Sequence, residues 1–317
     1  MKIALIIACA LIVLGLVIGI IGLALIGFNF KEMSTVKTVE NTYTVAQPFS
    51  HVRISSSIGS LEIRPATDGV CRLECVETAK LYYTHTLEND TLCVTLTNNM
   101  RWFDYIGINT ASARAVLYLP DAAYASLCVE NSTGSTKVEN GLTFGSVMLR
   151  GSTGALSFSA DVTETLDVTG STGSVTLENT TVGGDLTLKS STGSVTLCNV
   201  TVGGKLVMET GTGSAKLKNV HCKTLTTTHG SGSTTLTDVV ASERIDVTGS
   251  TGSVTLARID APTIKIRTET GSVRGSLRGE KVVLATSKTG SIDVPRGTQG
   301  GICEIETSTG SIHITIE

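Results

Sequence analysis

Aromatic side chains, charges and prolines are scarce in this sequence, and each shortage excludes a class of protein. Only 4% of the 317 residues are aromatic, and the last of these is Phe158, so the second half of the chain offers no aromatic platform for a sugar or a base. The net charge is −3, from 25 basic and 28 acidic residues, which leaves no basic footprint for nucleic acid. The 33 glycines stand with only 5 prolines and no Gly-X-Y triplets, which excludes collagen.

The cysteines do not form a recognisable disulfide framework. One of the eight is Cys9, in an apolar segment, and the other seven stand at irregular spacings. We therefore interpret them mainly as core-filling thiols. A disulfide or metal site formed by Cys71, Cys75 and Cys93 stays open as an alternative, and overall the sequence predicts no metal and no cofactor.

An uncharged apolar run lies at the N-terminus. It covers residues 3–28, and 26 residues make about 39 Å of helix, enough to cross a bilayer core of about 30 Å. We predict a transmembrane signal anchor over residues 1–30, in contact with the lipid bilayer through residues 3–28. Because Lys2 precedes the run while Lys31 and Glu32 cancel after it, the N-terminus is expected in the cytoplasm and the remaining chain outside the membrane.

Three alternatives concern the same segment. A cleaved signal peptide has a shorter apolar stretch than this one, and a lipoprotein cysteine at Cys9 has too few apolar residues before it. Gly15 and Gly19 form one GxxxG motif, which allows two helices to pack closely. Dimerisation through these two glycines is therefore a further hypothesis.

A repeat of 19 or 20 residues dominates the rest of the chain. Ser-Thr-Gly-Ser or a near copy recurs ten times, with its glycine at positions 134, 154, 173, 193, 213, 232, 252, 271, 290 and 310. Aliphatic residues alternate before and after each glycine, as at Leu186 and Leu188 before Gly193 and at Val195 and Leu197 after it. Alternation at period two indicates strands, and a single repeat cannot bury its apolar face alone.

The repeat predicts an all-β fold, a β-solenoid whose coils stack about 4.8 Å apart. We expect a β-rich capping region over residues 31–125 and solenoid repeats over residues 126–317. Within the capping region, residues 57–63 already resemble an imperfect coil. Six residues after the repeat glycine, a column of turn-forming side chains predicts a ladder at one bend: Asn140, Asn179, Asn199, Asn219 and Asp238.

The pattern is similar to a known family. An apolar anchor, a β-region ending in Val116 to Pro120, and the repeated S-T-G-S-V-x-L phrase together resemble the bacterial β-strand-repeat family of "putative adhesins", a domain of unknown function. The resemblance covers residues 45–317. It implies a solenoid on the outer side of a bacterial membrane, in a family sometimes associated with envelope-stress sensing, and it supplies no catalytic motif.

Two segments are candidates for partner binding. Arg101, Trp102, Phe103 and Tyr105 hold the only tryptophan and have the residue types of interface anchors, although they could equally pack over the capping region. The chain also stops inside a strand pattern that contains Ile312, Ile314 and Ile316, which predicts an unpaired edge open to β-augmentation.

The sequence therefore favours a non-enzymatic, membrane-anchored extracytoplasmic solenoid that contacts an envelope or surface protein as an adhesin, a scaffold or a stress sensor. Self-assembly into homo-oligomers or filaments is the first alternative. A hydrolase or lyase of envelope glycans is the second, disfavoured because the outward column three residues after the repeat glycine contains no pair of acids.

Overall fold

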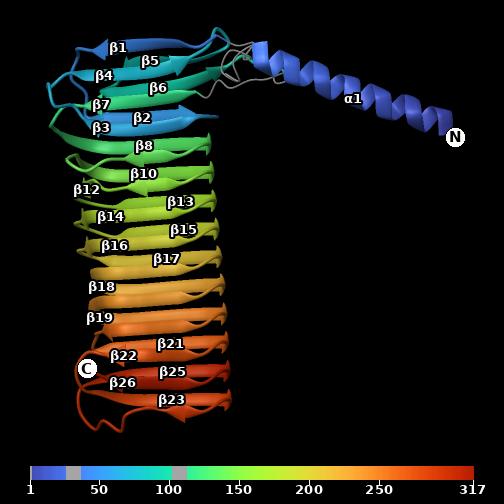
Figure 1. Ribbon diagram of the computed structural model, residues 1–317. Helices are drawn as coiled ribbons and strands as arrows, with labels where there is room; N and C mark the ends of the chain where they lie inside the picture. Colours follow the sequence, from blue (N-terminus) through green and yellow to red (C-terminus); the bar gives the residue numbers. More distant parts are fainter. Residues whose placement is uncertain (1, 26–36, 102–112) are drawn as a thin grey trace.

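The protein is a tall stack of β-coils with a strand cap at one end (Figure 1). This computed structural model describes residues 2–25, 37–101 and 113–317. Within these ranges one helix, α1 (Lys2–Leu25), precedes 26 strands that all belong to a single sheet wound into the stack. The prediction of an all-β solenoid is confirmed.

Each coil turns three times, as the repeat around Gly173 illustrates. Strand β13 (Leu166–Thr172) leads into a bend at Gly173, and β14 (Val175–Val182) follows with a second bend inside it at Asn179. A Gly183-Gly184 bend then leads to the next coil. The coil therefore has three faces, and each one points aliphatic side chains inward.

The aliphatic columns of the repeat form one continuous core. β13 pairs in parallel with β15 (Leu186–Thr192), which pairs with β17 (Lys205–Thr212), so that Leu166, Leu186 and Leu206 stack directly on one another. These three leucines are at most 1% exposed. Burying each such side chain stabilises the fold by about 1.5–3 kcal/mol, which explains how small repeats without aromatics still form a stable stack.

The repeat glycine is required by both conformation and space. All ten repeat glycines have φ between +127° and +152°, a region that side chains with a Cβ avoid. At Gly193, for example, an added Cβ would lie 1.9 Å from the carbonyl oxygen of Gly173 in the coil above. The glycine spacing in the sequence therefore records where each coil bends against its neighbour.

The capping region contains both a coil and its cover. β2 (His51–Ser56) and β3 (Ser60–Pro65) are joined by a bend at Gly59. They pair in parallel with β8 (Ala123–Thr133) and β9 (Thr136–Val138) of the first repeat, so residues 51–65 are a coil of the solenoid. β6 (Thr91–Asn98) and β7 (Arg114–Leu119) pair in parallel on their other side. β5 (Leu81–Glu88) pairs antiparallel with β6, β4 (Cys71–Glu77) with β7, and β1 (Val39–Val45) with β4. In space the coil of residues 51–65 thus lies between two segments that follow it in the chain.

At the other end of the stack the order of the coils in space also differs from their order in the chain. β25 (Gly301–Thr309) and β26 (Ile312–Ile316) lie between the coil of β21 and β22 and the coil of β23 and β24, as Figure 1 shows at the bottom of the stack. We call residues 301–316 the inserted coil and residues 281–293 the terminal coil. The last segment of the chain is therefore the penultimate layer of the stack.

α1 occupies the apolar N-terminal run. Among the described residues, no helix meets the length and apolarity of a membrane span. The transmembrane anchor therefore remains a prediction.

The remaining strands have the following bounds. In the cap they are β1 (Val39–Val45), β4 (Cys71–Glu77), β5 (Leu81–Glu88), β6 (Thr91–Asn98) and β7 (Arg114–Leu119). In the stack they are β8 (Ala123–Thr133), β9 (Thr136–Val138), β10 (Thr143–Thr153), β11 (Leu156–Phe158), β12 (Asp161–Val162), β16 (Val195–Val202), β18 (Ala215–Ser231), β19 (Thr234–Thr251), β20 (Val254–Ile259), β21 (Thr263–Thr270), β22 (Val273–Leu277), β23 (Lys281–Thr289) and β24 (Ile292–Asp293).

Candidate functional site: a groove in the last coils

The predicted C-terminal edge strand lies inside the stack over part of its length. Ile312, Ile314 and Ile316 lie on β26, which pairs with β22 throughout and with β24 at Ile312 and His313. Ile312 and Ile314 are buried in the core. On the side of β24 the strand is thus covered only at its first two residues, and partner binding at this edge stays a prediction. The repeat pattern shows that a coil exists but not its position in the stack.

The aromatic candidate can be placed only in part. Arg101 is exposed three residues after the end of the cap strand β6, whereas Trp102, Phe103 and Tyr105 lie outside the described residues. Their role as interface anchors therefore stays a prediction.

The turn column forms a hydrogen-bonded ladder over part of its length. The side-chain amide of Asn199 donates to Oδ1 of Asn179 at 2.9 Å, and that of Asn219 donates to Oδ1 of Asn199 at 2.9 Å. These three residues and Asp238 have φ between +51° and +56°, the left-handed conformation that Asn and Asp tolerate best. The ladder thus has a structural origin at this bend.

Both ends of the column depart from the prediction. Asn140 has no positive φ, and Gly141 takes the left-handed conformation instead with φ +83°. Asp238 accepts two hydrogen bonds from the guanidinium of Arg258, at 2.7 and 2.6 Å, so an ion pair extends the column by one coil. The Arg258 hydrogen bonds also lower the pKa of Asp238.

Four of the seven described thiols are buried, those of Cys71, Cys75, Cys222 and Cys303, and the other three are partly exposed. Cys71, Cys75, Cys93, Cys128, Cys198, Cys222 and Cys303 are free. Burial raises the pKa of Cys75, Cys222 and Cys303 to about 12, so these thiols stay protonated and weakly reactive. The described residues contain no group of three or more His, Cys, Asp or Glu side chains that could hold a metal.

Gly15 and Gly19 both lie on α1. No atom comes within 4 Å of a Cβ built at either position. Helix pairing through these glycines is untested and stays a prediction.

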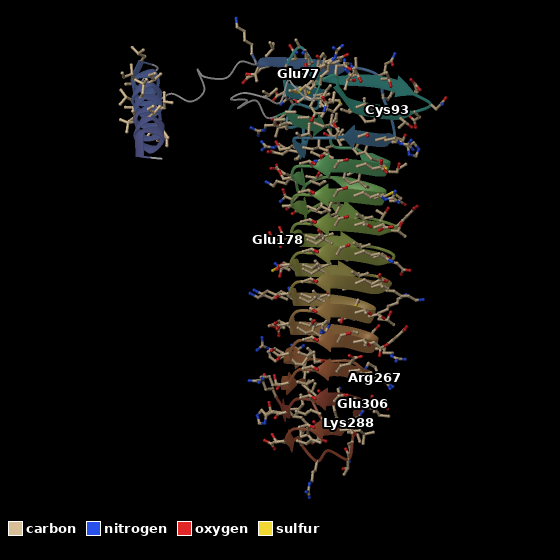
Figure 2. All side chains as sticks on the ribbon, turned by 90° about the vertical axis from the view of Figure 1, so that its right-hand side faces the viewer. Glu77, Cys93, Glu178, Arg267, Lys288 and Glu306 are labelled. Atoms are coloured by element: carbon tan, nitrogen blue, oxygen red, sulfur yellow. The ribbon has the colours of Figure 1, made fainter. Side chains whose placement is uncertain are left out.

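A groove of about 410 Å³ lies on the outer surface of the last coils, across β19, β21, β25 and β23. We call it the C-terminal groove. Figure 2 shows Arg267, Glu306 and Lys288 one below another in this part of the surface. The complete lining is Thr248, Gly249, Ser250, Arg267, Thr268, Glu269, Thr286, Lys288, Glu306, Thr307 and Ser308.

The groove arises because one repeat position changes its residue type. Two residues before the repeat glycine, the first seven repeats have only Ser or Gly, whereas the eighth and ninth have Glu269 and Lys288. Their long side chains stand opposite Arg267 and Glu306, which occupy the column four residues before the glycine. Thr248 and Thr286 share the column of Arg267 and Glu306, and Ser250 and Ser308 share that of Glu269 and Lys288.

Coil insertion determines which of these charges are paired. Arg267 Nε donates to Glu306 Oε2 at 2.8 Å. Glu269 and Lys288 have no ion pair within the described part of the chain, because Ser308 of the inserted coil lies between their strands. At about 4.8 Å per coil their backbones are about 10 Å apart, so the groove presents one free carboxylate and one free ammonium beside a row of hydroxyls.

The groove is equipped for binding more clearly than for catalysis. Two of its hydroxyls, those of Thr268 and Thr307, donate to the carbonyl oxygens of Gly252 and Gly271 at 3.4 and 3.1 Å. Neither hydroxyl is thereby activated by a base, as nucleophilic catalysis requires. The sequence reasoning missed this groove because it considered the outward column after the glycine and not the columns before it.

The fold and the groove define a β-solenoid with glycine bends and a charged groove in its last coils. The family model of Toastrack DUF4097 matches residues 49–212 and 204–317. The chain therefore belongs to the Toastrack DUF4097 family, in agreement with the resemblance seen in its repeats.

Solved structures of similar proteins were also found. A "putative adhesin" from Bacteroides fragilis NCTC 9343 is 14% identical, with 89% of this chain and 99% of that chain covered and a TM-score of 0.39. A "putative adhesin" from Parabacteroides merdae ATCC 43184 is 12% identical, with 89% and 98% covered and a TM-score of 0.43. A "putative lipid binding protein" from Parabacteroides distasonis ATCC 8503 is 13% identical, with 87% and 96% covered and a TM-score of 0.45. No curated protein matches the chain.

Proposed function

We propose that this protein is a non-enzymatic, membrane-anchored solenoid that presents the C-terminal groove to a protein or another component of the cell envelope. The observation that carries the proposal is the pair of exposed charges without an ion-pair partner among the described residues, Glu269 and Lys288, held beside a row of hydroxyls on a stack of paired strands. Such a surface recognises a polar partner through complementary charges and hydrogen bonds. Adhesion, scaffolding and envelope-stress sensing all use a displayed surface of this kind.

The arrangement along the chain supports display at a distance from the membrane. The predicted anchor precedes the cap, and 13 residues separate Leu25 of α1 from Val39 of β1, a connection of at most about 45 Å. Ten coils at about 4.8 Å extend the solenoid by about 48 Å. In this proposal the cap lies nearest the membrane, and the C-terminal groove lies at the end that reaches other molecules.

The groove is tested by crosslinking the tagged full-length protein in cells and identifying its neighbours by mass spectrometry. The variant carries Glu269→Gln and Lys288→Gln, which keep the side-chain sizes approximately and remove both free charges. Its matched control carries Lys189→Gln and Glu209→Gln, which remove an exposed ion pair of 3.1 Å on the same face. A neighbour that is lost at least ten-fold in the groove variant and kept in the control supports the proposal.

Two other results would contradict it. Equal recovery of all neighbours from the groove variant and the wild type would show that the groove is not the recognition surface. Turnover of envelope glycan by the purified protein, abolished by Glu269→Gln, would replace a binding role by an enzymatic one.

The anchor and its direction need a separate experiment. Protease added outside intact cells should digest the solenoid, while an N-terminal tag before Lys2 stays protected. Digestion of the tag together with the solenoid, or release of the whole protein without detergent, would contradict the proposed anchor and leave the groove proposal untouched.

A further inference from the structure

The terminal coil has one side without a strand partner. β23 pairs with β25, and β24 pairs with β26; among the described residues no other strand adjoins either of them. At the opposite end of the stack, β4 and β5 cover β7 and β6 in antiparallel pairs. β1 and β5 are the edge strands at the capped end, each paired on one side. At the other end the terminal coil itself exposes the backbone hydrogen-bonding groups of β23.

The open end also exposes apolar surface. Val283, Ala285 and Val294 pack against the core but are only partly buried. Leu284 is 54% exposed and Ile292 is 44% exposed. A long edge strand with exposed aliphatics is a site for pairing with another strand.

The charges that usually protect such an edge are few. Lys281 is only 7% exposed, and its ammonium donates to Oδ1 of Asp260 at 2.6 Å. It is therefore held toward the interior of the stack, at Asp260 directly after β20, and does not project beyond the end. Lys288 is then the one exposed charge along β23.

We propose that β23 pairs with β23 of a second copy of this chain in an antiparallel, two-fold arrangement. A two-fold interface brings the same surface of both copies together, and here each copy would cover the same unfinished core of the other. With the axis at Ala285, Leu284 lies opposite Thr286 and Val282 lies opposite Lys288. In this register no two like charges face each other, and the inward residues of one strand face those of the other.

This pairing goes beyond the proposed recognition of an envelope partner. The two solenoids would meet at their terminal coils and point in opposite directions, with the two caps at the far ends. With the proposed anchors beyond the caps, the pair connects two facing membranes, which is a homophilic contact between cells.

The test measures the mass of the full-length protein in detergent by light scattering, together with amide hydrogen exchange, over a range of protein concentrations. The variant is Leu284→Lys, which places a charge at the centre of the edge on an already exposed position. The control is Val207→Lys, which changes an outward aliphatic residue at the same repeat position in β17, a strand paired on both sides. We expect a dimer in which hydrogen exchange of the β23 amides slows at least ten-fold. The dissociation constant of the dimer should be at least ten-fold higher for Leu284→Lys but not for Val207→Lys.

Three results would overturn it. A monomer at every concentration would show that the edge does not pair. A dimer without protection of β23 would place the contact elsewhere, for example at Gly15 and Gly19 of the helix. Open-ended filaments would show an arrangement without two-fold closure. None of these results affects the crosslinking outcome at Glu269, so failure here is distinct from failure of the groove proposal.

Discussion

Arg267 Nε donates a hydrogen bond to Glu306 Oε2 at 2.8 Å, although 39 positions separate the two residues in the chain. The neighbouring pair, Lys265 and Glu304, lies at 2.9 Å on the same two strands. Both contacts skip the terminal coil, whose corresponding residues are Leu284 and Thr286. Opposite charges thus adjoin only when residues 301–316 are inserted, so the ion pairs favour the inverted order of coils.

Reversing these charges should destabilise the end of the stack. Glu304→Lys with Glu306→Lys places like charges on adjacent strands, and because all four side chains are partly or largely exposed, we expect a loss of about 1–2 kcal/mol. Adding Lys265→Glu and Arg267→Glu to the same chain should restore most of that loss. Urea unfolding measures both effects, and a four-fold variant as unstable as the two-fold variant would show that charge does not select the order of coils.

The repeat glycine should tolerate no side chain. Gly193→Ala puts a Cβ 1.9 Å from the Gly173 carbonyl oxygen at a φ of +136°, and we expect a cost of about 3 kcal/mol or more. Gly69→Ala is the matched control, because Gly69 has φ +71° but nothing within 4 Å of an added Cβ. Its cost should be about 1–2 kcal/mol. Equal losses in urea unfolding would mean that the close contact between coils relaxes freely.

The sequence predicted the coils better than their order. The glycine spacing gives the coil length, and the alternation around each glycine gives the inward columns, because both follow from local geometry. The three-faced coil was not predicted, since only the positive φ at residues such as Asn179 shows that the turn column is a true bend. The positions of the inserted coil and of Glu269 relative to Lys288 depend on contacts between distant segments, which the period alone does not report.

His229 should make the stability of the stack depend on pH. Its ring is 3% exposed, Nδ1 lies 3.1 Å from Thr234 Oγ1, and Nε2 is buried without a partner. Gly249 in the next coil provides the space for this ring, since a Cβ there would lie 1.9 Å from Nε2. Burial lowers the pKa of His229 below 6.5, so the folded state holds the neutral ring and the unfolded state takes up a proton more readily.

The sign of the pH effect follows from that difference. The neutral ring's contribution to the free energy of unfolding is fully present above about pH 6.5. It is lost as the pH falls through the pKa of the unfolded state toward the lower pKa of the folded state, by at most about 1.4 kcal/mol per pH unit. Asn131 occupies the same repeat position and donates to Thr136 Oγ1 at 3.2 Å, so His229→Asn should keep a similar contact with Thr234 without titrating. Urea midpoints at pH 7.5 and pH 5 should therefore fall further in the wild type than in His229→Asn. An equal fall in both proteins would assign the acid sensitivity to other groups.

The buried carboxylate of Glu77 should determine whether the cap closes the first coils. Glu77 is 3% exposed, and its position at the top of the stack is visible in Figure 2. Its oxygens accept hydrogen bonds from the Asn41 amide at 2.6 Å, the Tyr43 hydroxyl at 3.1 Å and the Tyr83 backbone N–H at 2.6 Å. One side chain on β4 thus satisfies donors from both β1 and β5, which are not paired with each other.

Removing that carboxylate should release β1 before the rest of the protein unfolds. Glu77→Ala leaves three donors in the cap without their acceptor, at a cost of about 3 kcal/mol or more. Glu77→Gln keeps the volume but replaces one accepting oxygen by an NH2 group that faces a donor, so it should recover only part of the loss. Hydrogen exchange is the decisive measurement, with faster exchange expected in β1 and β5 and unchanged exchange in the repeats from β13 onward. Uniformly faster exchange along the whole stack would instead show that the cap and the solenoid unfold as one cooperative unit.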